Sequence, residues 1–201
     1  MSYAVVIEGL GVLDSFGALK KDIEFAAIRA INKAARDGRK NAADMIRTQV
    51  KLSPGDVGPK SGLLSVAKQA QRGSLEARIR ARGRPTSLAR YVTSANRKRG
   101  VTLQVSPGKA TFMRRAFLVK LRAGSADIVT KSNRGLAIRL RPGERLDRKH
   151  KQVQLGKGLV LLYGPSVQQV FSDNAGKGVA EDISPEILNK MEGEFLRLLK
   201  L

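Results

Sequence analysis

The chain of 201 residues has no cysteine and no tryptophan, and it has a single histidine. The absence of cysteine excludes a disulfide framework, a thiolate zinc site and a cysteine nucleophile. Because aromatic residues make up only 4% of the chain, the core must be built from alanine, valine, isoleucine and leucine. No run of 18 apolar residues occurs, so we expect no membrane-spanning helix. The first residues carry Glu8 and Asp14 without a basic cluster, so we expect no signal peptide.

Acidic residues are also scarce, with 17 Asp and Glu against 38 Lys and Arg and a net charge of +21. The imbalance is concentrated in residues 61–160, which hold 24 Lys and Arg and four Asp and Glu. Residues 161–201 instead hold four basic and six acidic residues. Self-repulsion of this size opposes a compact isolated state. We therefore expect the middle of the chain to face an acidic partner.

Two helices are predicted from the spacing of apolar residues. Between about Ser15 and Val50 these residues recur at steps of three and four, which predicts a long helix with an Ala-rich stripe. Gly38 weakens its middle by about 1 kcal/mol relative to Ala, which allows a kink or break there. The segment "DISPEILNKMEGEFLRLLK" predicts a C-terminal amphipathic helix, with Ser184 as the N-cap and Pro185 at the first helical position.

The region between the helices changes to a period of two. In "SLEARIRARGR", apolar and basic residues alternate, which predicts a half-buried strand with an almost purely basic face. Further strands are predicted in "GVTLQVSPG", "FMRRAFLVKL" and "GLAIRLRPG", a hairpin in "VQLGKGLVLLYG", and a short helix in "LLSVAKQAQRG". The expected fold is a single α+β domain over 1–201, with an antiparallel or mixed β-sheet of about four to six strands. Its parts are 1–52 (strand and long helix), 53–74 (loop and short helix), 75–165 (basic β region) and 166–201 (C-terminal helical region).

The segment "GPSVQ" resembles the nucleophile elbow Gly-x-Ser-x-Gly but lacks its final glycine. The only histidine, His150, lies among basic residues that keep its imidazole solvated or disfavour its charged form. We therefore interpret Ser166 as a helix N-cap in a capping box, in which the side chains of Ser166 and Gln169 each bond the backbone N–H of the other. The surrounding segment is predicted to be a packing or assembly corner, and its residues are Tyr163, Gly164, Pro165, Ser166, Val170 and Phe171. No catalytic residue, cofactor site or metal constellation is predicted.

Four basic clusters remain: "RIRARGR", "RKR", "RR" and "RKHK". A single cluster is usually a solvated face, but four within one hundred residues, with few acids between them, favour contact with a polyanion or an acidic protein. The contact residues are predicted to be Arg78, Arg80, Arg82, Arg84, Arg97, Lys98, Arg99, Arg114 and Arg115. We expect no base-specific readout, because no helix-turn-helix or zinc-finger pattern occurs. The C-terminal segment has five acids that allow two interpretations, a solvated helix face or a docking surface for another subunit's basic patch. These acids are Glu181, Asp182, Glu186, Glu192 and Glu194.

Taken in order, these pieces resemble the minor tail protein Z family of tailed phages and prophages, the tail-completion proteins of lambda-like tails. The resemblance covers most of the chain. It is strongest in "AIRAINKAARDGRKNAADMIRTQV", "LEARIRARGRPTSLARY", "RRAFLVKLRAG" and "LYGPSVQQVF" before the final helix. It rests on the ordered set, since no single motif is specific by itself, and the family has no enzymatic residues to carry over.

The resemblance implies a virion structural protein at the head-proximal end of the tail, assembled in the host cytoplasm. It completes the tail for joining the head. Its implied partners are its own copies in a ring, for which we assume six-fold symmetry, the tail terminator and other tail or neck proteins, and the packaged DNA end. No membrane is expected among its partners. A second hypothesis from a different class is a sequence-independent nucleic-acid-binding protein outside any virion, which the basic composition fits equally well.

Overall fold

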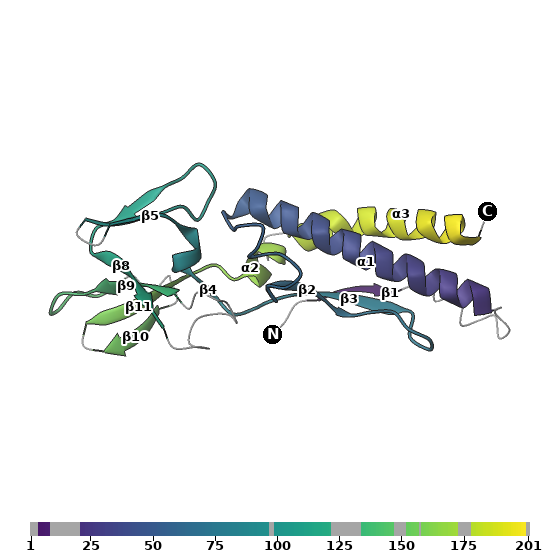
Figure 1. Ribbon diagram of the computed structural model, residues 1–201, viewed down its shortest axis with the longest axis horizontal. Helices are drawn as coiled ribbons and strands as arrows, with labels where there is room; N and C mark the ends of the chain where they lie inside the picture. Colours follow the sequence, from purple (N-terminus) through teal and green to yellow (C-terminus); the bar gives the residue numbers. More distant parts are fainter. Residues whose placement is uncertain are drawn as a thin grey trace.

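The structure is a computed structural model, and it describes residues 4–8, 21–96, 99–121, 134–146, 152–156, 158–172 and 178–199. The helices are α1 (Lys21–Gln49), α2 (Val167–Phe171) and α3 (Val179–Leu199), with a 3-10 turn, η2 (Leu88–Tyr91). The strands are β1 (Ala4–Glu8), β2 (Leu64–Lys68), β3 (Glu76–Ala81), β4 (Thr86–Ser87), β5 (Val92–Asn96), β6 (Gly100–Leu103), β7 (Thr111–Met113), β8 (Ala116–Lys120), β9 (Arg134–Arg139), β10 (Gln152–Gly156) and β11 (Leu159–Gly164). This is the predicted α+β fold, with a long helix near its start and a second helix at its end (Figure 1).

One half of the molecule, the helical half, pairs α1 with α3 over the antiparallel sheet β1-β3-β2 (Figure 1). The 29 residues of α1 give a helix about 44 Å long at 1.5 Å per residue. Its predicted Ala-rich stripe is fully buried, as at Ala27, Ile31, Ala35, Ala42 and Ile46. The stripe needs no further subunit over most of its length, because α3 and the sheet cover it from two sides.

Gly38 does not break α1, which continues as one helix on both sides of it. A Cβ atom built on Gly38 would lie only 2.4 Å from Cδ1 and 2.6 Å from Cγ1 of Ile187 in α3. The glycine therefore permits close approach of the two helices. The cost in helix propensity is offset by a contact that only the pairing of α1 with α3 creates.

The segment 64–68 is a strand, and the short helix predicted there is wrong. As β2 it pairs antiparallel with β3, placing Leu64 opposite Ala81 and Val66 opposite Ile79. A short apolar run fits the period of a helix or of a strand. The neighbouring strand selects the extended form, because the edge of β3 offers backbone partners to Leu64, Ser65, Val66 and Lys68.

The C-terminal helix begins earlier than predicted, at Val179. Val179 and Ala180 are buried and extend the apolar face backwards along the chain. Ser184 is therefore not the N-cap, and its hydroxyl donates to the carbonyl of Ala180 at 2.6 Å. Pro185 lies inside the helix instead of at its first position.

The other half of the molecule, the β half, contains two sheets, whereas the sequence predicted a single sheet for the whole chain. In the first, the strands follow the order β10-β11-β9-β8, and β4 also pairs with β11; the second has the order β5-β6-β7. Every pairing between described strands is antiparallel. The predicted strand "FMRRAFLVKL" divides at a turn where Arg115 has a φ of 91°, so β7 pairs with β6 and β8 pairs with β9.

Each half has its own hydrophobic cluster. The cluster of the helical half contains the stripe of α1, the inner faces of β2 and β3, and the buried residues of α2 and α3. The cluster of the β half is built from β6, β8, β9 and β11. Leu88 and Val105 pack against both clusters. The two halves are thus joined by apolar contact at their boundary as well as by the chain.

Candidate functional surfaces

The predicted basic face of β3 lies on the solvent side of the helical half. Ala77, Ile79 and Ala81 are buried, whereas Arg78 and Arg80 are exposed. The burial alternates because successive side chains of a strand point to opposite faces. The alternation predicted for this strand is therefore confirmed.

Glu76 partly neutralises this face. Its carboxylate accepts hydrogen bonds from Nζ of Lys68 at 2.6 Å and from Nη2 of Arg78 at 2.8 Å. These bonds, chiefly the one from Lys68, lower the pKa of Glu76. The face therefore mixes one carboxylate with several cations and is less purely basic than the sequence suggests.

Arg82 and Arg84 lie beyond the end of β3. The backbone of Arg82 is held on both sides: its N–H donates to Leu63 at 2.8 Å, and its carbonyl accepts from Gln168 at 3.1 Å. Arg82 is half-buried, whereas Arg84 is exposed. Arg82 thus belongs to the junction between the halves more than to an exposed row with Arg78 and Arg80.

A second basic group lies in the β half, at turns on one end of the sheet β5-β6-β7. Arg99 precedes Gly100, whose position is so close to β7 that a Cβ there would lie 2.4 Å from the carbonyl oxygen of Met113 and 3.0 Å from Cα of Arg114. The structure therefore brings Arg99 and Arg114 together, with Arg115 next in the chain, while β3 lies in the other half (Figure 1). The predicted residues Arg97 and Lys98 lie outside the described residues.

Arg115 binds the only acid described in the β half. Its guanidinium forms two hydrogen bonds with Glu144, at 2.8 and 2.5 Å. The Arg115 bonds, together with the backbone N–H of Arg141, lower the pKa of Glu144 to about 2. Glu144 is thus an anion already bound to one cation. Of the other described cations of this half, Arg90 pairs with Asp56, in the loop after α1.

The β half has a large excess of exposed positive charge. Between residues 82 and 164 the described chain has 12 Lys and Arg and one acid. Ten of the cations are exposed: Arg84, Arg99, Lys109, Arg114, Arg115, Lys120, Arg134, Arg139, Arg141 and Arg145. An open cleft of about 730 Å³ beside β10 is lined by two of these, Arg141 and Arg145, together with Gln152 and Gln154.

The predicted corner joins the two halves. Tyr163 and Gly164 end β11 in the β half, opposite Ser87 and Thr86 of β4. A Cβ on Gly164 would lie 2.9 Å from Cδ2 of Leu88, so the absence of a side chain lets η2 pack against the corner. Pro165 follows, half-buried, and α2 then enters the helical half.

The capping box predicted after the corner is present. The Ser166 hydroxyl accepts from the backbone N–H of Gln169 at 3.1 Å, and the side-chain oxygen of Gln169 accepts from the N–H of Ser166 at 2.8 Å. Val167, Val170 and Phe171 are buried in the core of the helical half. Ser166 is itself buried, and its hydroxyl caps α2. The candidate base His150 lies outside the described residues.

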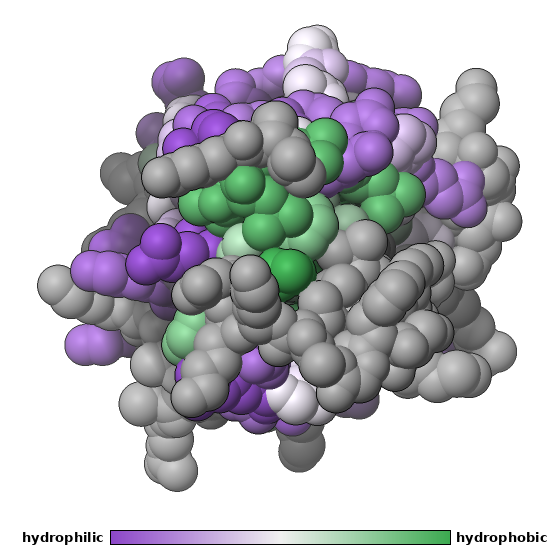
Figure 2. Space-filling view, turned by 90° about the vertical axis from the view of Figure 1, so that its right-hand side faces the viewer, coloured by the Kyte–Doolittle hydropathy of each residue, from purple (hydrophilic) through white to green (hydrophobic). Residues whose placement is uncertain are grey.

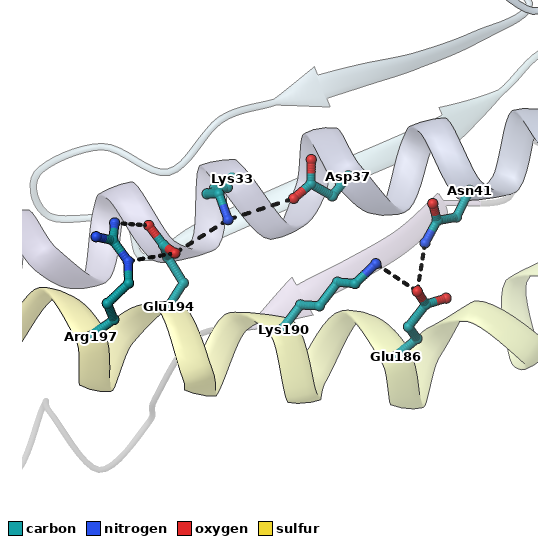
Figure 3. A network of polar contacts seen from close by, with 7 residues as sticks. All are labelled: Lys33, Asp37, Asn41, Glu186, Lys190, Glu194 and Arg197. Carbon is teal, nitrogen blue, oxygen red and sulfur yellow. Dashed lines mark hydrogen bonds and ion pairs between the residues drawn. The ribbon is translucent and has the colours of Figure 1, made fainter.

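Two of the predicted acidic residues bind within the helix pair (Figure 3). Glu194 of α3 accepts from Lys33 of α1 at 3.2 Å and from Arg197 at 2.6 and 3.1 Å. These bonds, led by that from Arg197, lower the pKa of Glu194 to about 2. About two turns earlier in α3, Glu186 accepts from Asn41 at 2.8 Å and from Lys190 at 2.6 Å.

These bonds link α1 to α3 on the rim of their apolar contact. Sequence reasoning missed them, because the charges of α1 and α3 are about 150 residues apart in the chain and no local pattern pairs them. Two of the five acids, Glu186 and Glu194, are thus bound by other side chains of the same chain. The other three, Glu181, Asp182 and Glu192, are exposed.

Comparison with known proteins gave no matching family model, no matching curated protein and no matching solved structure. Within the described ranges, no helix combines the length and the apolar character needed to cross a membrane. Over the same ranges, no group of three or more His, Asp or Glu side chains is placed to hold a metal ion. The features of this chain that bear on its function are therefore its surfaces.

Proposed function

We propose that this protein is a non-enzymatic structural subunit of a phage tail, located at the head-proximal end and required to complete the tail for head joining. The ordered resemblance to the minor tail protein Z family supports this assignment. The buried position of Ser166 in a capping box also agrees with it, because a nucleophile must be accessible to its substrate.

The observation that carries the proposal is the difference in charge between the two halves of the molecule. The acids Glu186 and Glu194 are bound inside the helical half, whereas the β half has ten exposed cations and a single described acid. Such a surface attracts phosphate backbones or acidic protein surfaces and gains affinity by releasing counterions. A subunit next to the end of a packaged genome, or next to acidic tail proteins, needs a surface of this kind.

The test compares two double variants that each remove two exposed positive charges. Arg99→Gln with Arg114→Gln changes the β half, and Arg29→Gln with Arg36→Gln changes the outer side of α1. In a phage that encodes this chain, infectious titre is measured beside a count of assembled tails. The β-half variant is expected to lower the titre while the α1 variant does not. Wild-type titre for both variants would refute the proposal.

The same basic surface supports a second candidate, a free sequence-independent DNA-binding protein. Binding to duplex DNA is measured by fluorescence anisotropy at several salt concentrations. Each phosphate contact contributes about 0.9 to the slope of log affinity against log salt, so the β-half double variant is expected to lower that slope by up to about 1.8. DNA binding of this kind, together with normal tail completion in a phage lacking the protein, would favour the second candidate over the first.

A further inference from the structure

Two phenylalanine rings are exposed at opposite ends of the molecule, and they differ in what surrounds them. At the end formed by the helix pair, Phe25 is 47% exposed, and the guanidinium of Arg72 lies 4.7 Å from its ring centroid. Figure 2, which faces this end, shows a hydrophobic patch bordered by hydrophilic side chains. Phe112 lies in the β half, at the other end of the long axis (Figure 1), and is 58% exposed. In the part of the chain that the structure describes, no cation covers the Phe112 ring.

Phe112 lies on the outer face of the sheet β5-β6-β7. Its register partner in β6 is Thr102, and the partner of Thr102 in β5 is Ser94. Residues directly opposite each other in neighbouring strands share one face of a sheet, so these three side chains form a row. The residues on either side of Thr102, Val101 and Leu103, are buried in the cluster of the β half. The row therefore lies on the face turned away from the core, and its two hydroxyl side chains are too short to cover the ring.

Cations lie on both sides of Phe112 along the chain. Lys109 precedes it by three residues and Arg114 follows it by two, and both are exposed. Successive residues of an extended chain are at most about 3.6 Å apart, so the backbone of Lys109 lies within about 11 Å of Phe112 and that of Arg114 within about 7 Å. Arg99 lies beside Arg114 at the same end of this sheet.

The chain around this ring has no acid of its own. Residues 77–126 contain 13 Lys and Arg and neither Asp nor Glu. An exposed aromatic ring is therefore combined with positive charge, which is the combination that proteins use to bind single-stranded nucleic acids.

We propose that this face binds single-stranded nucleic acid, with a base stacked on Phe112 and the flanking phosphates bound by the neighbouring cations. The surface, which we call the Phe112 face, consists of Ser94, Thr102, Phe112, Arg99, Lys109 and Arg114. Every base has a π-face that stacks on an aromatic ring irrespective of sequence. The cations gain affinity by releasing the counterions of the phosphates. Binding of this kind needs no base-specific contact.

A single strand fits the Phe112 face better than a duplex or an acidic protein does. The bases of a duplex are stacked on one another, so a duplex contacts the cations and leaves the ring unused. An acidic protein segment also binds through the cations alone. Unpaired bases use the ring and the cations together. The inference rests on the proposed function of the β half as a contact surface, and it names the chemistry of the partner.

The first test measures the fluorescence anisotropy of labelled oligo(dT) and of a labelled duplex of the same length. Phe112→Ala is expected to weaken oligo(dT) binding by about 5- to 150-fold, the loss that one stacked base causes, and to leave duplex affinity unchanged. The matched control is Phe25→Ala, which removes an exposed ring outside this face and is expected to leave both affinities unchanged. Circular dichroism and a thermal melt check that both variants keep the fold.

The second test uses the absence of tryptophan from the chain. Phe112→Trp introduces a single indole on the face, and a base stacked on an indole quenches its fluorescence. Oligo(dT) is therefore expected to quench Phe112→Trp, which keeps the affinity of the wild type because an indole also stacks on bases. The control Phe25→Trp is expected to keep its emission when oligo(dT) is added.

Three results would overturn the inference. The first is equal oligo(dT) binding by wild type and Phe112→Ala, or an equal loss for oligo(dT) and duplex. The second is emission from Phe112→Trp that oligo(dT) leaves unchanged. The third is a wild type that binds polyglutamate and does not bind oligo(dT), which would identify an acidic protein as the partner.

These outcomes are separate from that of the proposed function, since no phage is used. Oligo(dT) binding that follows the expected pattern, together with wild-type titre for both charge double variants, would remove the tail assignment and keep the Phe112 face. A chain that does not bind oligo(dT), with a lowered titre for the variant Arg99→Gln with Arg114→Gln, would keep the tail assignment and remove the Phe112 face.

Discussion

Replacing Gly38 by alanine tests the close packing of α1 on α3. At an exposed helix position this change stabilises a protein, because glycine is about 1 kcal/mol worse than alanine in a helix interior. In this protein the added methyl group would lie 2.4 and 2.6 Å from two carbons of Ile187, whereas carbon atoms in good contact are about 3.5–4.0 Å apart. Ile187 is buried and β-branched, so it has little freedom to turn away.

The steric term is expected to exceed the gain in helix propensity. Adding a methylene to a well-packed core costs about 1–3 kcal/mol, and an overlap of about 1 Å with two carbons of a stiff side chain belongs at the upper end of that range. Subtracting about 1 kcal/mol of propensity leaves a net loss of about 1–2 kcal/mol. For a chain of this size that corresponds to a melting temperature lower by about 2–8 °C.

Urea unfolding of Gly38→Ala measures this loss. The matched control is Gly193→Ala in α3, where a Cβ meets no atom within 4 Å, and there the change is expected to stabilise by about 0.5–1 kcal/mol. Ile187→Ala alone is expected to cost about 2–5 kcal/mol, and in the double variant the Gly38→Ala penalty is expected to disappear. A Gly38→Ala protein at least as stable as wild type would refute the packing argument.

Three further changes test other parts of the structure. Phe171→Ala is expected to lower the free energy of unfolding by about 3–5 kcal/mol, because this ring is fully buried in the helical half; an unchanged urea midpoint would contradict that. Ser166→Ala removes the cap and is expected to cost about 0.5–2 kcal/mol, with no change in the count of assembled tails. The pKa of Glu194 is lowered to about 2, so its contribution to stability is present above its unfolded pKa and is lost as the pH falls towards 2. Glu194→Gln is therefore expected to flatten the fall in stability between about pH 5 and 2, and an unchanged acid profile would exclude the ion pairs with Lys33 and Arg197 as its cause.

Local features were predictable from the sequence because their causes lie within a few residues. The capping box depends on Ser166 and Gln169, three positions apart. The burial of β3 follows from alternation within six residues, and the stripe of α1 follows from the helical period. The short segment 64–68 was not predictable, since five residues fit either period and only pairing with β3 selects the strand.

The α+β class, the two long helices, the capped corner and the excess of positive charge follow from composition and from short-range periodicity. How these parts meet was set by the tertiary structure alone. It placed Arg78 and Arg80 on one sheet and Arg99 and Arg114 in turns beside another, turned Gly38 into a contact point for Ile187, and bound Glu194 to Lys33. Each of these depends on contacts between residues far apart in the chain, and such contacts are fixed by strand pairing and core packing, which no local pattern specifies.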